Sequence, residues 1–167
     1  MQAVYRLSDM LAGVMAIIGG VMIVTMMVHV TVDVIARSVF NLPLPGTITI
    51  VSSYYMVAAA FLPLAYTELK KGHVAVELFY DRFNTVVQQH LSGFADLLGV
   101  VIFGFMSHRA LGEAMSRMAR GASSMDGSYI IPTWPGYFIV FAGLALTTMI
   151  MAIGLIKYVD GLIRARA

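Results

Sequence analysis

Four long stretches of this sequence are almost free of charged side chains. Residues 10–32, 48–67 and 134–156 contain no Asp, Glu, Lys or Arg, and residues 91–107 contain only Asp96. A helix that crosses a hydrocarbon core of ~30 Å needs about 20 apolar residues. None of the stretches shows the strict alternation of a membrane β-strand. The sequence therefore predicts an all-α integral membrane protein with four transmembrane helices.

The composition supports this class and excludes others. Hydrophobic residues make up 59% of the 167 residues and charged residues 12%, whereas soluble domains average about 45–50% and about 25%. The absence of cysteine excludes disulfides and thiolate chemistry. A net charge of +2 gives no reason to expect nucleic acid as a partner. We expect a single membrane domain over residues 1–167 and no enzyme activity, because no catalytic or phosphate-binding motif is present.

The connections between the spans can also be predicted. Residues 41–46 contain two prolines and a glycine, so they form the turn between the first two spans. From Val76 onward, apolar residues recur every three or four positions, which predicts a short interfacial helix before the third span. The third helix is expected to extend over residues 85–120, and residues 121–135 form the last loop. Pro63 is expected to kink the second span.

Glycines inside the predicted spans are expected to be positions where helices approach each other closely. They are Gly13, Gly19, Gly20, Gly93, Gly99, Gly104, Gly143 and Gly154.

The distribution of basic residues predicts the orientation in the membrane. Seven of the eleven lie at the termini and in the middle loop, and four lie on the other side. The four are Arg37, Arg109, Arg117 and Arg120. Because Lys and Arg are enriched in cytoplasmic loops, we expect both termini in the cytoplasm.

Three polar residues follow one another at the end of the first span. His29, Asp33 and Arg37 are spaced by four residues, so they share one helix face and Asp33 could accept hydrogen bonds from both neighbours. Ionisable groups in membranes are candidates for proton or ion relays. We favour instead a ladder that packs the helix against a neighbour, because Asp33 and Arg37 follow the apolar run and lie close to water.

Asp96 is the only acidic residue inside the third apolar stretch. It could bind a cation or a proton, or it could have a structural role, either extending toward the membrane interface or pairing with Lys157 of the fourth span; we favour a structural role. The histidines suggest one further alternative, a membrane anchor of a redox complex that binds haem. Two histidines that bind one haem must lie at the same depth, and His29 and His108 approach the same leaflet. Lone histidines at helix ends are commoner than ligands, so we expect no cofactor.

Three segments in order along the chain resemble motifs of one transporter family. Residues 33–46 read Asp-Val-Ile-Ala-Arg-Ser-Val-Phe-Asn-Leu-Pro-Leu-Pro-Gly, and residues 71–78 read Lys-Gly-His-Val-Ala-Val-Glu-Leu. Residues 131–135 read Ile-Pro-Thr-Trp-Pro. Together with the length and the four spans, they resemble the small membrane subunit, the DctQ type, of tripartite ATP-independent periplasmic (TRAP) transporters. One departure is the stretch 47–50, which lacks the glutamate that the family often carries there.

The resemblance implies a role in scaffolding. It implies that the subunit lies in the bacterial inner membrane and joins a large permease subunit that holds the transport and sodium sites. A periplasmic solute-binding protein delivers the substrate, typically an organic acid. Arg109, Arg117 and Arg120 are then candidates for docking that protein, since complementary charge guides encounter. Contacts of these arginines with lipid headgroups are an equally good interpretation.

Overall fold

The computed structural model describes residues 2–42, 44–70, 85–127 and 129–166, and the interfacial helix expected before the third span begins outside this part. The described helices and strands are α1 (Gln2–Phe40), α2 (Thr47–Ile50), the π-helix η1 (Val51–Tyr55), α3 (Met56–Phe61), α4 (Leu64–Leu69), α6 (Thr85–Ala119), β1 (Ser123–Asp126), β2 (Tyr129–Pro132) and α7 (Trp134–Arg166).

Four helical segments are long and apolar enough to cross a membrane, which confirms the predicted fold class. They are Ser8–Phe40, Thr47–Leu69, His90–Ala119 and Trp134–Gly161. The second span is the series α2, η1, α3 and α4, and the other spans are single helices. The third helix covers residues 85–119, close to the predicted extent.

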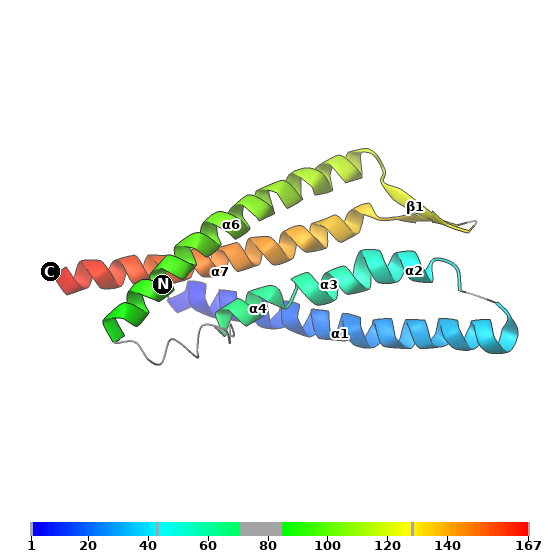
Figure 1. The fold of residues 1–167 in the computed structure, drawn as a ribbon, viewed down its shortest axis with the longest axis horizontal. Helices are drawn as coiled ribbons and strands as arrows, with labels where there is room; N and C mark the ends of the chain where they lie inside the picture. The colour runs from blue at the N-terminus through cyan, green and yellow to red at the C-terminus, as the bar shows by residue number, and fades with distance from the viewer. Residues whose placement is uncertain (1, 43, 71–84, 128, 167) are drawn as a thin grey trace.

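The spans form a row over most of their length, and near its start α1 also contacts α7. α7 packs along α6 on one side and against α3 and α4 on the other, and α1 packs on the outer side of α3 and α4 (Figure 1). The start of α1 and the end of α7 lie at one end of the row, and the β1–β2 hairpin and the α1–α2 turn lie at the other (Figure 1). We call these the terminal end and the hairpin end. Each edge helix therefore leaves most of its surface uncovered.

The second span fits into the row through backbone contacts at glycines. The Phe61 carbonyl lies directly against Gly143 of α7, and the Ser53 carbonyl lies against Gly136 of the same helix. On the other side, a Cβ added at Gly19 of α1 would lie 2.8 Å from Pro63 Cγ. Without a hydrophobic driving force in lipid, such close approach of small residues is a main source of helix association.

Between α6 and α7, side chains of one helix lie against glycines of the other. Gly93 lies against the Tyr158 ring, Gly99 against Met151 and Gly154 against the Asp96 carboxylate, while Gly104 makes an ordinary contact with Thr148. Gly13 and Gly20 make no such close contact with the described part of the chain, because none of its neighbouring atoms lies within 4 Å of a Cβ built there. Both are on the side of α1 that the described residues leave open.

The second span is interrupted where Pro63 was expected to kink it. α3 ends at Phe61 and α4 begins at Leu64. Pro63 has no N–H to donate, so the helical ladder cannot continue through it. Its carbonyl accepts the N–H of Thr67 at 3.0 Å and starts the next helix.

The last loop contains an antiparallel hairpin that the sequence analysis does not predict. Ser123 pairs with Pro132 and Asp126 with Tyr129, which leaves a two-residue connection. Gly127 adopts φ 61°, the left-handed conformation that the primed hairpin turns require. In the sequence, the two-residue connection is Gly127-Ser128, and a glycine at the first position of such a connection is a hairpin signal.

Candidate functional site

The hairpin end of the row contains a buried carboxylate that joins helix α1 to the following turn. Asp33 is only 6% exposed. Its Oδ1 accepts the N–H of Leu44 at 2.8 Å, and its Oδ2 lies 3.3 Å from Nη2 of Arg37. The helix ends at Phe40; the next residue, Asn41, has φ 52°, and the Leu42 N–H donates to the Ala36 carbonyl. Asp33 therefore fixes the direction in which the chain leaves α1.

His29 does not extend this arrangement into a ladder of three. The hydrogen bond that the structure gives His29 joins its Nδ1 to the Tyr55 hydroxyl at 3.3 Å, with the two rings edge to face. Asp33 instead accepts from the backbone of the turn and from Arg37. The expected hydrogen bond between His29 and Asp33 is therefore wrong, because the partner of His29 is Tyr55 of the second span.

The π-helix η1 connects three neighbouring elements at this level. Tyr55 reaches His29 on α1, and the hydroxyl of Tyr54 donates to the carbonyl of Pro132 in the hairpin. The carbonyl of Ser53 meets Gly136 on α7. A π-helix holds its carbonyls and side chains at angles that differ from those of an α-helix, and such turns are frequent at functional sites.

The hairpin rests on the α1–α2 turn. Ile131 Cδ1 lies where a Cβ at Gly46 would be, and Gly46 has φ 81°. The same turn is therefore held by Asp33 from one side and covered by Ile131 from the other. On the free side of the hairpin, Met125 and Ile130 are 72% and 67% exposed.

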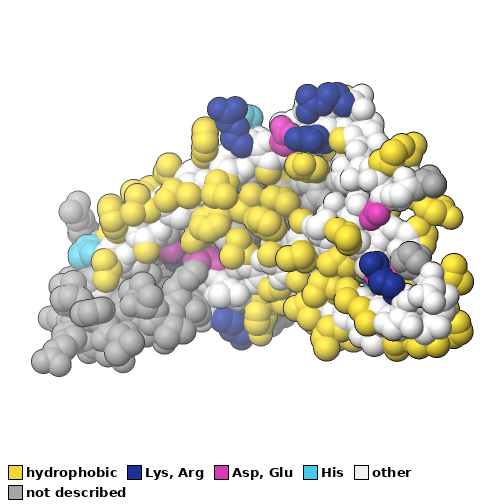
Figure 2. Space-filling model, turned by 45° about the vertical axis from the view of Figure 1, so that its right-hand side comes forward, with side chains coloured by type: hydrophobic (Ala, Val, Ile, Leu, Met, Phe, Trp, Pro, Cys, Tyr) yellow, Lys and Arg dark blue, Asp and Glu magenta, His cyan; other side chains and the backbone are white. Residues whose placement is uncertain are grey.

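The three arginines proposed for docking lie along one side of α6 but differ in their contacts. Arg117 Nε lies 2.6 Å from Oε1 of Glu113, and its guanidinium lies 5.2 Å from the centre of the Tyr137 ring. Arg109 lies 5.4 Å from the centre of the Phe105 ring. Arg120 is exposed at the end of the helix. Basic side chains form the upper edge of the molecule in Figure 2, above a broad hydrophobic area.

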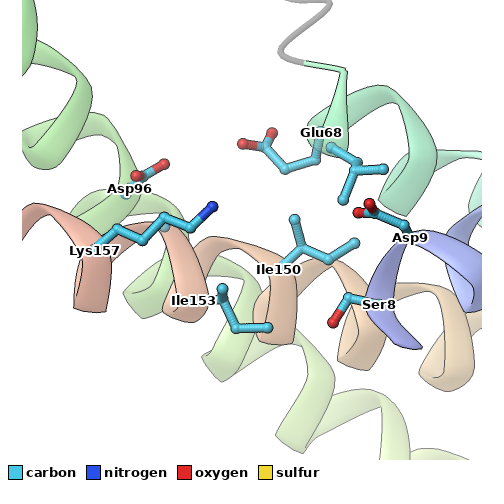
Figure 3. A pocket seen from close by; sticks show the side chains of 9 residues that line it. Ser8, Asp9, Glu68, Asp96, Ile150, Ile153 and Lys157 are labelled. Carbon is cyan, nitrogen blue, oxygen red and sulfur yellow. The ribbon is translucent and has the colours of Figure 1, made fainter. Parts of the chain in front are cut away.

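Asp96 lines a cavity of about 180 Å³ at the terminal end of the row, where charged and apolar side chains are mixed. The cavity lies where α1, α4, α6 and α7 meet, and it is lined by Ser8, Asp9, Glu68, Leu69, Asp96, Ile150, Ile153, Gly154 and Lys157. Figure 3 shows the Lys157 side chain extending past Asp96 with its Nζ pointing into the cavity. Among the described residues, no group of three or more His, Asp or Glu side chains could hold a metal ion.

The described histidines do not form the facing pair that bis-histidine haem ligation needs. His29 lies on α1 and His108 on α6, the helices at opposite edges of the row (Figure 1). His90 Nδ1 is 2.6 Å from the hydroxyl of Tyr158. The arrangement expected for a haem anchor is therefore wrong for His29 and His108.

The fold and its polar residues define a small multi-pass membrane protein whose spans lie side by side. A family model described as the DctQ component of tripartite ATP-independent periplasmic transporters matches residues 26–160. The chain therefore belongs to the DctQ family and is a small membrane subunit of a TRAP transporter. Comparison with curated proteins and with solved structures found no match.

Proposed function

We propose that the chain supports the large permease subunit of its transporter and helps a periplasmic solute-binding protein to dock during sodium-coupled uptake of an organic acid. The observation that carries this proposal is the open row of helices, together with membership of the DctQ family. Secondary transporters build their substrate and ion sites at mid-membrane from broken helices and polar groups. Here the one broken span is packed by glycine contacts against α1 and α7.

The near absence of charged side chains from the predicted apolar stretches also supports a scaffold role for this chain. Asp96 is the one charged side chain within the four predicted apolar stretches, and a carboxylate repels an anionic substrate. Asp96 lies at the terminal end of the row against Gly154. The chain thus offers an organic acid no fixed positive charge in mid-span, and the path for the substrate belongs to the large subunit.

The structure refines which arginines would dock the solute-binding protein. Arg117 is held by Glu113 and Tyr137, so its charge is largely compensated within the chain. Arg109 and Arg120 are eleven positions apart, which is close to three helical turns, so they project from the same side of α6. We propose that these two attract an acidic surface, while Arg117 keeps the end of α6 close to α7.

The orientation completes the proposal. We propose that the protein lies in the bacterial inner membrane with both termini in the cytoplasm. The excess of Lys and Arg at the termini and in the middle loop of the sequence supports this orientation. The hairpin, the α1–α2 turn and the three arginines of α6 would then face the periplasm.

Reconstitution into liposomes tests the proposal. With a sodium gradient, we expect uptake of the transporter's organic acid when this chain, the large subunit and the solute-binding protein are all present. The chain by itself should carry none. Sodium-driven uptake by this chain alone would contradict the scaffold role. If Asp96→Asn then abolished that uptake, the chain would be a transporter in its own right.

A further inference from the structure

A narrow apolar stripe runs along nearly the whole of α1 and is covered by no described part of the chain. It includes Met10, Ile17, Val21, Val28, Ile35 and Val39, all of which are exposed. Their spacing of four and seven residues places them within about 20° of one line along a helix of 3.6 residues per turn. Val28 is 58% exposed and Val39 66%. We call this set the α1 stripe.

The buried polar residues and the close-packed residues of α1 lie on the other side. Ser8, Ala12 and Asp33 are buried against neighbouring elements, and Gly19 meets Pro63. α1 therefore has one side that faces the second span and an opposite side that is apolar from end to end. Gly13 and Gly20, beside the α1 stripe, have open space around them.

The α1 stripe is longer than a bilayer can cover. At ~1.5 Å per residue, Met10 and Val39 are about 44 Å apart along the helix axis. The hydrocarbon core is only ~30 Å thick. Lipid could cover the full length only if α1 tilted by about 45°, whereas spanning helices tilt by about 20° on average and by up to about 40°.

The excess length lies at the hairpin end. We place the opposite membrane surface near the cavity that includes Asp9, Glu68 and Lys157, just before Met10, because charged side chains are costly inside hydrocarbon. If the hydrocarbon begins at Met10, an upright helix leaves it after about 20 residues, near residue 30. Ile35 and Val39 then lie in water unless protein covers them, at the same level as the exposed Arg37.

We infer that the α1 stripe is the surface on which the large permease subunit binds, and this inference rests on the proposed function. The stripe is uncharged and runs through the membrane and beyond it. The protein that covers it must therefore itself span the membrane and project from it. Permanent interfaces are apolar, and a soluble protein that binds and leaves uses a more polar surface. The open space at Gly13 and Gly20 lets a partner helix approach the backbone of α1 closely.

Cysteine accessibility tests this inference in a chain that has no native cysteine. Ile35→Cys and Val39→Cys are prepared singly, with Met118→Cys on α6 as the control for general accessibility. A membrane-impermeant maleimide is added to the chain alone in lipid nanodiscs and to its complex with the large subunit. We expect Val39→Cys to react in the chain alone and about tenfold more slowly in the complex, because an interface core excludes water. Met118→Cys should react alike in both.

Any other outcome would contradict the inference, and each points to a different explanation. If Val39→Cys is unreactive already in the chain alone, lipid covers the α1 stripe. If it reacts equally in both samples, another surface binds the large subunit, while the proposed function stands because the complex formed. Protection that appears only after the solute-binding protein is added would assign the stripe to that protein. Failure of the two membrane subunits to co-purify at all would instead remove the proposed function.

A photo-crosslinking residue provides a second test, which uses the complex and needs no measurement on the chain alone. p-Benzoylphenylalanine replaces Val28 in the α1 stripe or, as the matched control, Val101 on the exposed side of α6. We expect an adduct with the tagged large subunit from position 28 and none from position 101. An adduct from position 101 alone would place the large subunit on α6 and overturn the inference.

Discussion

The carboxylate of Asp33 accepts a hydrogen bond from the backbone N–H of Leu44, eleven residues further along the chain, at 2.8 Å. Asp33 is the residue at which α1 is tied to the turn that follows it. Arg37 joins the same carboxylate from the outside, with 59% of its side chain exposed. The two contacts of Asp33 therefore differ in burial, and they should differ in their contribution to stability.

The first prediction separates these two contacts. Asp33→Ala leaves the partly buried Leu44 N–H without its acceptor, which costs at most about 1–3 kcal/mol, the range for a fully buried donor. Arg37→Ala removes an exposed i,i+4 pair worth about 0.3–0.5 kcal/mol. We expect Asp33→Ala to lower the midpoint of thermal unfolding of the purified chain clearly more than Arg37→Ala does.

Asp33→Asn is the matched control, because its amide oxygen can still accept the Leu44 N–H. It should retain most of the stability that Asp33→Ala loses. Equal loss in Asp33→Asn and Asp33→Ala would mean that the charge of Asp33, and not its hydrogen bond to the turn, holds this part of the molecule together.

The second prediction uses glycines with and without neighbours. Gly143→Ala places a Cβ against the carbonyl of Phe61, so the second span must move away from α7. Overpacking of this kind typically costs about 1–3 kcal/mol. We expect a lower unfolding midpoint for Gly143→Ala, measured by circular dichroism of the chain in detergent.

Gly20→Ala provides the comparison on α1. No neighbouring atom of the described residues lies within 4 Å of a Cβ at Gly20, and alanine favours a helix more than glycine does. Its unfolding midpoint should stay unchanged or rise. A loss of stability as large as that of Gly143→Ala would contradict the arrangement of α1 described above.

The spans could be predicted from the sequence because they depend on length and apolar content alone. Pro63 was also informative, since the break in the second span follows directly from its missing N–H. The spacing of Asp33 and Arg37 likewise placed them within reach of each other on one helix face. These features are local, so each depends on a few neighbouring residues.

The sequence does not predict features that depend on contacts between segments far apart along the chain. The sequence does not indicate that Tyr55 bonds to His29, because this contact requires the π-helix η1 to face α1. It also does not distinguish Gly143, which meets a carbonyl, from Gly20, which meets nothing, because both lie in apolar spans. The hairpin could have been predicted, since the Gly127-Ser128 pair that connects its strands is a known hairpin signal.

The third prediction concerns topology. If both termini are cytoplasmic, a cysteine at the exposed Ser123 in β1 should react with an impermeant maleimide added to intact spheroplasts. A cysteine at Gly72 should react only after the membrane is permeabilised. The reverse pattern would show that the hairpin faces the cytoplasm, and it would exclude the docking role proposed for Arg109 and Arg120.

The last prediction separates the arginines of α6 by their existing partners. Arg120→Glu reverses an exposed charge, and we expect it to slow association of the solute-binding protein with the complete membrane complex. Charge on the rim of an interface acts mainly on the association rate, so the difference from the wild type should shrink as salt is raised. Arg117→Ala should change the association rate less, because Glu113 already compensates its charge, but it should lower stability by removing the contact with Tyr137. Surface plasmon resonance at two salt concentrations measures the rates. An unchanged association rate for Arg120→Glu at low salt would assign these arginines to lipid headgroups instead.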